Sequence, residues 1–531
     1  MTVRRLERPW SRFLAVLFCC SGAGAAVSAC GFSGTTSNGA GGTPSTNGGT
    51  SSNNYEYTGT WPGAPIKYPK SAVGKLTYVK KVIHPNFLAE SCSIADYNND
   101  GKVDVSSGRL WYEGPDFTKQ HKFRDGHGIL PSSGAGPELN TGVSDDWADY
   151  PFDINHDGNV DIINIAQCDV PETTDTNPKV GTVQVHASAV WYQNPGPAGQ
   201  VGDPNWTPHV MHTDVRLEQH GLLDINGDGF PEIYGACKSC TPPTTKGYYQ
   251  GDPANPMSPW TYHAVTGPFT FPFGGLGWMH GEGGGDVNGD GKSDLLERSG
   301  AWLQQANGSF NQTPCTALDP ATHQGVPAGC GYLKHDFYDG QVDNAGNKGA
   351  SHMYAVDMDM DGIPDVVAAD WAHGEGLFWY KGSANGTFTK YQFMGPMADA
   401  AKWGVYFSEP HSLQVADMDG DGRPDIVTGK MRFAHPVGQG DPDLMGVPYI
   451  YVFKNVGTPD TAHGTGSPIT LQPIKVDPMT AGTLGTPDGG MGVGRQLAVG
   501  YIGTPAMDGT NDAILDICVG TKVGLAVFIG Q

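Results

Sequence analysis

The stretch DINGDGFPE, Asp224–Glu232, decides the fold because it is one of six similar acidic loops in the chain. The other five begin at Asp96, Asp153, Asp286, Asp357 and Asp417, and all six fit the pattern D-x-[DN]-x-D-G-x-x-[DE]. They recur at intervals of roughly sixty residues, a period typical of architectures that repeat one small structural unit.

Each acidic loop is followed by runs that favour β-strands. DVVAAD and DIVTGK come directly after two of the loops, and aromatic runs such as GLFWYKG and YIYVFKN follow a little later. Short strands separated by turn residues fit a chain with 77 Gly and 40 Pro, and no long amphipathic helix is evident. Each unit is therefore predicted to be a small antiparallel sheet.

A seventh unit is predicted at the C-terminus. GRQLAVGYIG aligns with PHSLQVADMDG, which places Arg495 at the position of His411. This last unit ends after its aromatic strand, and residues 76–85, LTYVKKVIHP, are predicted to supply its outer strand. Such sharing closes a ring without an open edge, so residues 55–531 are predicted to form an all-β, seven-bladed β-propeller. An open solenoid is the alternative.

The loop pattern predicts calcium. Oxygen side chains at positions 1, 3, 5 and 9 converge on a hard cation, and glycine at position 6 permits the sharp turn. About six Ca²⁺ ions are expected, and six acidic turns without metal are the alternative. The seventh loop lacks the pattern. The predicted ligands are Asp96, Asn98, Asp100, Asp104, Asp153, Asn155, Asp157, Asp161, Asp224, Asn226, Asp228, Glu232, Asp286, Asn288, Asp290, Asp294, Asp357, Asp359, Asp361, Asp365, Asp417, Asp419, Asp421 and Asp425.

These loops and their flanking strands resemble the FG-GAP or VCBS repeats of integrin-type β-propellers, over roughly residues 76–531. The resemblance implies a propeller fold with calcium in the loop between the first and second strands of a blade. It implies no reaction, because one fold hosts many functions.

The N-terminus predicts export. Residues 1–29 read as a signal peptide, Val27–Cys30 resembles a bacterial lipobox, and residues 30–54 read as a lipidated Cys30 followed by a flexible tether. An outer-membrane or cell-surface lipoprotein is expected, with a periplasmic or secreted protein after ordinary cleavage as the alternative. A net charge of -23 argues against nucleic acid, and against membrane contact other than through the anchor. A monomer is expected.

Export predicts disulfides among the seven cysteines beyond Cys30. Cys315–Cys330 is the predicted pair, because both cysteines flank one loop. Cys237 and Cys240, in CKSC, either pair with each other or with other cysteines.

Polar residues precede the acidic loops by four or six positions, offsets that share one face of a strand. In a propeller the first strand of each blade lines the central channel, so these residues are predicted to ring one mouth of it. His352 has an odd offset and needs a bulge to join them. The candidate catalytic residues are His220, His280, Glu282, His352, His411 and Arg495.

The second strand of each blade returns to the same rim and adds loop residues there. The predicted ligand-binding residues are Glu218, Trp147, His373, Lys430, Arg432 and His435. The leading hypothesis is a face that binds an extracellular glycan or protein. One alternative is a metal-dependent polysaccharide lyase or sugar dehydratase with an additional transition metal at the histidines. The others are a structural surface adhesin and a channel mouth that is merely polar.

Overall fold

The chain divides into two units, Met1–Ser52 and Asn53–Gln531, and the computed structural model describes residues of the second unit only, from residue 76 onward. The predicted signal peptide, Cys30 and the tether therefore lie outside the described residues. Among the described residues, no helix is long and apolar enough to span a membrane. The described ranges are 76–125, 129–130, 143–144, 146–166, 189–215, 218, 221–237, 239–243, 245–266, 280–311, 313–315, 330–337, 350–369, 372–434, 441–477, 486–502 and 514–531.

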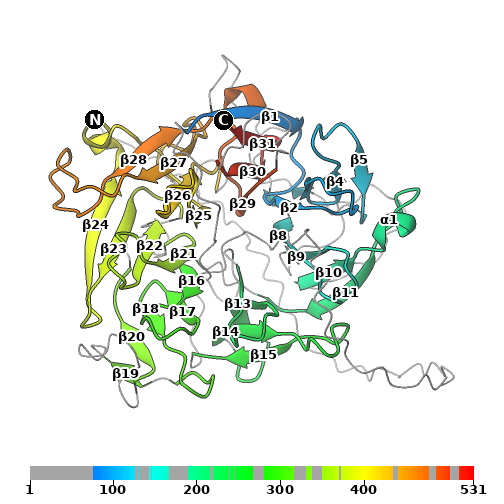
Figure 1. Ribbon diagram of the computed structural model, residues 1–531, viewed down its shortest axis with the longest axis horizontal. Coiled ribbons are helices and arrows are strands. Elements are labelled where there is room, and N and C mark those ends of the chain that lie inside the picture. The colour runs from blue at the N-terminus through cyan, green and yellow to red at the C-terminus, as the bar shows by residue number, and fades with distance from the viewer. Residues whose placement is uncertain are drawn as a thin grey trace, which may run out of the picture. The chain divides into compact units, whose positions relative to one another are not determined.

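The fold is an all-β propeller in which small antiparallel sheets surround a common centre (Figure 1). In the view of Figure 1, the first strand of most sheets lies toward the middle and the later strands lie toward the outside. In the sheet of the C-terminal strands, the outermost strand is instead the N-terminal one. Five sheets have four strands each among the described residues.

The five four-stranded sheets follow the chain around the centre. The first contains β2 (Ser93–Ala95), β3 (Asp104–Ser107), β4 (Leu110–Tyr112) and β5 (Gln120–Lys122). The second contains β8 (Asp146–Phe152), β9 (Asp161–Ala166), β10 (Ala189–Gln193) and β11 (Thr207–His212). The third contains β12 (Gly221–Leu223), β13 (Glu232–Cys237), β14 (Thr245–Gln250) and β15 (Thr261–Ala264). Another contains β25 (Leu413–Ala416), β26 (Asp425–Gly429), β27 (Ile450–Asn455) and β28 (Leu471–Lys475). The last contains β29 (Leu497–Gly500), β30 (Asp516–Thr521), β31 (Gly524–Gly530) and β1 (Tyr78–His84).

A nine-stranded sheet lies between the sheet β12–β15 and the sheet β25–β28. Its strands are β16 (Glu282–Gly285), β17 (Asp294–Glu297), β18 (Gly300–Trp302), β19 (Pro314–Cys315), β20 (Tyr332–Lys334), β21 (Met353–Val356), β22 (Asp365–Ala369), β23 (Leu377–Gly382) and β24 (Phe388–Met394). Its two halves, β16–β20 and β21–β24, meet where β16 and β21 pair in parallel. A Cβ built on Gly283 would lie 1.9 Å from the carbonyl oxygen of Met353, so glycine is what lets the two strands approach.

The remaining elements are short. They comprise a two-stranded sheet of β6 (Ile129–Leu130) and β7 (Val143–Ser144), α1 (Gly196–Gly199), α2 (Ala400–Trp403), and the 3₁₀ turns η4 (Met397–Asp399) and η5 (Pro487–Gly489).

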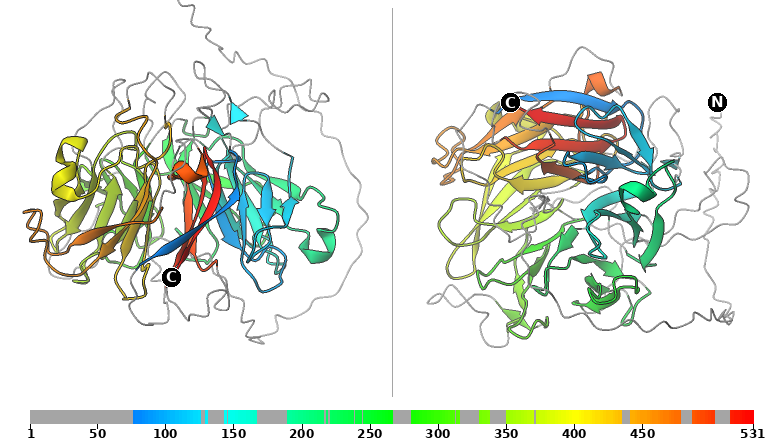
Figure 2. Two further views of the ribbon diagram at one scale, coloured as in Figure 1. Left: turned by 90° about the horizontal axis from the view of Figure 1, so that it is seen from above. Right: turned by 45° about the vertical axis from the view of Figure 1, so that its right-hand side comes forward.

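The N-terminal strand closes the last sheet, as the sequence predicts. β1 pairs antiparallel with β31, from Tyr78 opposite Gly530 to His84 opposite Leu525, and the blue strand lies beside the red ones in Figure 2. A disulfide between Cys92 and Cys518 also joins the first sheet to the last one. The two ends of the described chain are thereby held together by backbone pairing and by a covalent bond.

The core lies between neighbouring sheets. One buried cluster joins β25–β28 to the last sheet, another joins β21–β24 to β25–β28, and a third joins the second sheet to the third. Branched and aromatic side chains on the strands fill these interfaces, because each sheet can bury both of its faces only against neighbouring sheets.

The acid at position 9 of each loop ties its sheet together at the backbone. Asp425, for example, accepts N–H bonds from Met418 at 3.0 Å and from Asn455 at 2.7 Å. Asp516 occupies the same position in the last sheet and accepts from Ile502 and Gly530, both at 2.7 Å. The last sheet thus keeps the two N–H bonds to its acid although its loop lacks the rest of the calcium pattern. The ninth-position acid therefore organises the sheet independently of that pattern.

Candidate functional site

Four polar residues from separate segments of the chain converge in one buried cluster, which we call the central cluster. Its members are Glu218, His280, His373 and His411, and one ligand atom from each lies within 4.8 Å of the others. Their exposed fractions are 5%, 7%, 4% and 0%. Glu218, His280 and His411 precede β12, β16 and β25, while His373 lies between β22 and β23. The fold thus brings together side chains that are up to 193 positions apart (218 to 411).

Glu218 stands at the middle of the central cluster. Its Oε2 lies 2.6 Å from Nε2 of His280, 3.7 Å from Nε2 of His411 and 3.8 Å from Nε2 of His373. The Nε2 atoms of His280 and His373 are 2.7 Å apart. The three imidazoles meet edge to face, with ring centroids 4.6 to 5.0 Å apart. Three Nε2 atoms and one carboxylate oxygen therefore face one point.

The other oxygen of Glu218 is held by Arg495. The Arg495 guanidinium donates to Glu218 Oε1 at 2.9 Å and also to Glu90 Oε2. It lies over the ring of Trp147, 4.3 Å from the centroid. Lys522 lies 3.5 Å from Glu90 Oε1 and donates to the Phe433 carbonyl at 2.6 Å. Charged residues from the first and last sheets thus support the central cluster from one side.

The pKa values of Glu218 and His411 are both lowered, but for different reasons. Burial alone raises the pKa of Glu218, but His280 and Arg495 outweigh it and hold the pKa well below its usual range. Burial, reinforced by His280, lowers the pKa of His411 well below its usual value. At neutral pH the cluster accordingly combines an ionised carboxylate with a neutral imidazole at His411.

The converging residues stand ahead of the first strands rather than on them. His280 and His411 each lie two residues before the strand that follows, and Arg495 lies two residues before β29. Gly281, with φ of 81°, separates His280 from β16 and breaks the period-two alternation. Glu282 consequently pairs with Lys246, which also contacts Glu297 at 3.1 Å, away from the central cluster. The sequence expectation that offsets of four and six share one face does not hold here.

Other predicted residues are placed as follows. His352 is buried and is not one of the four clustered ligands. Lys430 pairs with Glu409 at 3.3 Å and donates to Ser408 at 2.6 Å. Arg432 is buried and lies over the ring of Phe433. His220 and His435 lie outside the described residues.

Sequence reasoning missed three of the charged residues around this centre as site residues: Glu90, Glu409 and Lys522. Glu90 had a usable signal, because it stands six positions before its loop, at the same offset as His280 and His411. Glu409 precedes His411 by two positions, and its partner Lys430 is distant in sequence. The sequence around Glu409 and around Lys522 contains no pattern that would predict the partner of either residue.

The six acidic loops gather their carboxylates to different degrees. Among the described residues, three carboxylates converge in the fifth loop (Asp357, Asp359, Asp361) and three in the sixth (Asp417, Asp419, Asp425). The first-position aspartate turns inward in all six loops; Asp224, for example, accepts N–H bonds from Asp228 and Gly229. Lys381 contacts the acids at positions 3 and 5 of the fifth loop. Calcium at these loops stays a prediction.

Calcium removal is expected to lower the melting temperature. An ion that binds only the folded loops stabilises the protein by about 2.7 kcal/mol at one hundred times its Kd. Differential scanning calorimetry before and after a calcium chelator, followed by re-addition of Ca²⁺, measures the effect. A melting temperature that is identical in all three states would contradict calcium binding.

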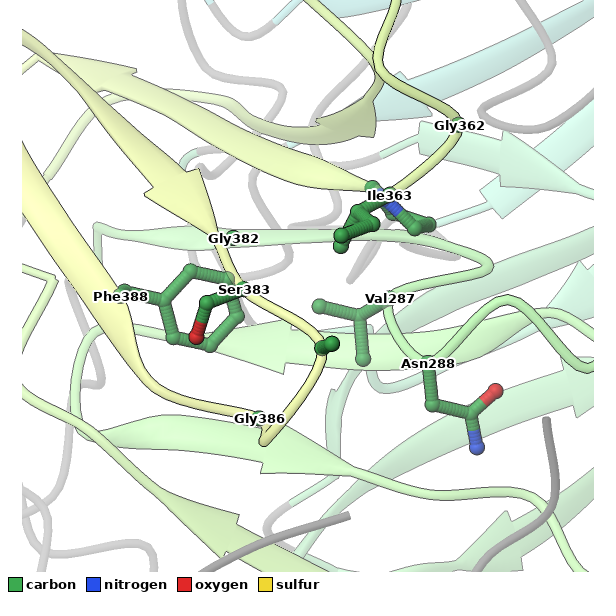
Figure 3. A pocket seen from close by; sticks show the side chains of 10 residues that line it. Val287, Asn288, Gly362, Ile363, Gly382, Ser383, Gly386 and Phe388 are labelled. Carbon is green, nitrogen blue, oxygen red and sulfur yellow. The ribbon is translucent and has the colours of Figure 1, made fainter. Parts of the chain in front are cut away.

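A surface pocket of about 360 Å³, including space open to solvent, lies beside the fourth and fifth acidic loops (Figure 3). It has no titratable side chain in its lining, so it offers no acid or base. The central cluster is therefore the better candidate for chemistry. The pocket is lined by Val287, Asn288, Gly362, Ile363, Pro364, Gly382, Ser383, Ala384, Gly386 and Phe388.

Comparisons with known proteins bear on the fold. No curated protein matches the chain. Among solved structures, it resembles the rhamnogalacturonan lyase YesW (12% identity, TM-score 0.34, covering 88% of this chain and 75% of that one). It also resembles a Bacillus licheniformis rhamnogalacturonan lyase (13%, 0.32, 86% and 76%). A third similar structure is the V. cholerae biofilm matrix protein Bap1 (14%, 0.26, 81% and 46%). Residues 346–428, which include the fifth and sixth acidic loops, match the family model of the FG-GAP-like repeat. This chain therefore carries an FG-GAP-like repeat within an all-β propeller.

Proposed function

We propose that the central cluster binds one transition-metal ion and that the protein acts through this ion on acidic carbohydrate, as a lyase or dehydratase. The observation that carries the proposal is the convergence of Glu218, His280, His373 and His411 within 4.8 Å. Their burial favours a metal site over direct contact between the imidazoles and a glycan, because a buried imidazole offers little surface to a polymer.

The donor set fits a transition metal. Imidazole suits zinc, copper, iron and nickel, whereas Ca²⁺ and Mg²⁺ prefer an all-oxygen shell. Ligand atoms about 2.1 Å from an ion lie roughly 3 to 3.5 Å from one another. The separations from Glu218 Oε2 to the three Nε2 atoms, 2.6 to 3.8 Å, span that range. Such an ion would supply Lewis-acid stabilisation of negative charge on a bound uronate or sugar oxygen.

The residues around the cluster have positioning roles in this proposal. Arg495 holds Glu218 through Oε1 and so leaves Oε2 directed at the histidines. Glu90 fixes Arg495 from the opposite side. Outer contacts of this kind orient metal ligands and are worth roughly 10- to 100-fold in affinity.

The rest of the proposal concerns the whole protein. We infer seven blades, because β16, β17, β18 and β20 form one antiparallel set of four strands and β21–β24 form another. The two sets share only two paired positions. We also propose calcium at the acidic loops and export of the chain, with lipidation at Cys30. The disulfide Cys92–Cys518 supports export, since such bonds persist in oxidising compartments.

His411→Ala is expected to lower the affinity for the transition metal by about 100-fold or more, because it removes a ligand rather than an outer contact. Metal analysis after saturation with calcium and with one transition metal at a time, followed by competition titration, measures the loss. His263→Ala is the matched control, because His263 stacks on Tyr248 and lies outside the cluster. Equal metal content in wild type and His411→Ala would contradict the assignment.

The activity is tested separately on uronate polymers and acidic oligosaccharides. Metal-loaded wild type is expected to generate unsaturated sugar ends, and His411→Ala is expected to lose this activity. Metal binding without any product would leave a metal centre and refute the lyase or dehydratase. A glycan array run beside the assay would then reveal pure carbohydrate binding, and absence of both would favour the adhesin.

A further inference from the structure

A second group of reactive side chains lies between the second and third sheets, apart from the central cluster. It consists of the Cys237–Cys240 disulfide and His212. His212 is the last residue of β11, and Cys237 is the last residue of β13. His212 Nε2 lies 3.8 Å from Cys240 Sγ. The three ligand atoms lie within 4.8 Å of one another.

The hydrogen bonds of His212 decide what this group can do. Its Nδ1 accepts the backbone N–H of Asp214 at 3.0 Å. A neutral imidazole that accepts at Nδ1 carries its proton on Nε2. Burial lowers the pKa of His212, which favours that neutral form. Nε2 therefore presents an N–H to Cys240 Sγ, whereas a metal ligand would need a lone pair there. This tautomer favours stabilisation of a thiolate over a metal site.

The two sulfurs differ in access and in support. Cys237 is fully buried, and Cys240 is half-buried. The backbone N–H of Cys240 donates to Cys237 Sγ at 3.1 Å. Ser239 N–H donates to Asp214 Oδ2 at 2.7 Å, which ties the turn between the cysteines to the segment after His212. Each sulfur thus has its own N–H donor, and Cys240 is the one that an outside thiol reaches more easily.

We propose that Cys237–Cys240 is a redox-active disulfide that exchanges with an external dithiol, with His212 stabilising the Cys240 thiolate. One thiolate of the dithiol attacks Cys240 Sγ and forms a mixed disulfide, while the Cys237–Cys240 bond breaks and Cys237 leaves as a thiolate. The second thiolate of the dithiol then closes the reagent's own disulfide and releases the Cys240 thiolate. Two electrons pass from the dithiol to the protein, and the thiolates take up protons from water.

The experiment equilibrates the intact, folded protein with mixtures of reduced and oxidised dithiothreitol, quenches with acid and alkylates the thiols for mass spectrometry. Cys237 and Cys240 are expected to become reduced together while Cys92–Cys518 stays bonded, because both residues of that pair are fully buried. Reduction of Cys92–Cys518 over the same range of dithiothreitol as Cys237–Cys240, or of neither pair until the protein unfolds, would overturn the proposal.

His212→Ala tests the role of the histidine. Loss of its N–H is expected to destabilise the Cys240 thiolate and to shift the exchange equilibrium about tenfold toward the disulfide. The control is His209→Ala, since His209 lies on the same strand but stacks on Trp191. Equal equilibria for the two variants would overturn the assignment to His212. If His212→Ala does not fold, His212→Asn serves, because its amide oxygen keeps an acceptor for Asp214.

Discussion

Arg495→Met is expected to lower the free energy of unfolding by about 3 to 5 kcal/mol, the typical cost of removing one partner from a buried ion pair. The Arg495 guanidinium pairs with Glu90 and with Glu218, whose exposed fractions are 0% and 5%. Methionine fills similar volume but leaves these carboxylates without that cation in a medium of low dielectric constant. The shift in the denaturant midpoint measures the loss.

A double variant separates the effect of the lost charge from the effect of altered packing at Arg495. Glu90→Gln combined with Arg495→Met removes one of the stranded charges, so it is expected to recover part of the lost stability. Arg495→Lys is expected to fall between wild type and Arg495→Met, because lysine keeps the charge but lacks the two separate guanidinium nitrogens that reach Glu90 and Glu218. If Arg495→Met is as stable as wild type, the carboxylates do not depend on this guanidinium and the network has been misassigned.

Asp516→Ala is expected to destabilise the protein by about 3 to 6 kcal/mol. Its carboxylate accepts two backbone N–H bonds, from Ile502 and Gly530, and bonds to a charged group contribute roughly 1.5 to 3 kcal/mol each. Both donors lie in the last sheet, where β1 closes the propeller against β31. Chemical denaturation of wild type and variant measures the difference.

Asp399→Ala provides the matched control for Asp516→Ala. It removes the same charge from an exposed aspartate at the start of α2 that makes no side-chain capping bond. A surface substitution of this kind is expected to change stability by less than about 0.5 kcal/mol. Equal effects of the two substitutions would show that net charge, rather than the two N–H bonds, explains the loss.

The repeat and the shared last sheet could be predicted from sequence because both depend on local patterns. The loop motif marks the turn between the first two strands of a sheet, and residues 76–85 contain the strand that pairs with β31. The merging of two sheets through β16 and β21 was not foreseen. It depends on how closely Gly283 approaches Met353, 70 positions away, and no local pattern carries that distance.

The candidate site was predicted only in outline. The offset of six positions identified His280, His411, Glu218 and Arg495, and the structure brings these four into contact. The offset of four positions failed at Glu282, because Gly281 turns the chain between His280 and β16. The return of the second strand to the same rim placed His373 among the predicted ligand-binding residues, but its direct contact with His280 could not be predicted.

The sequence by itself determined the strands, their turns and the closure of the last sheet, since period-two patterning and turn residues act over a few positions. Only the tertiary structure decided which polar residues meet. Glu218, His280, His373 and His411 come from four separate segments, and their separation at the centre is set by the packing of whole sheets. The tautomer of His212 and its distance from Cys240 depend in the same way on two neighbouring sheets.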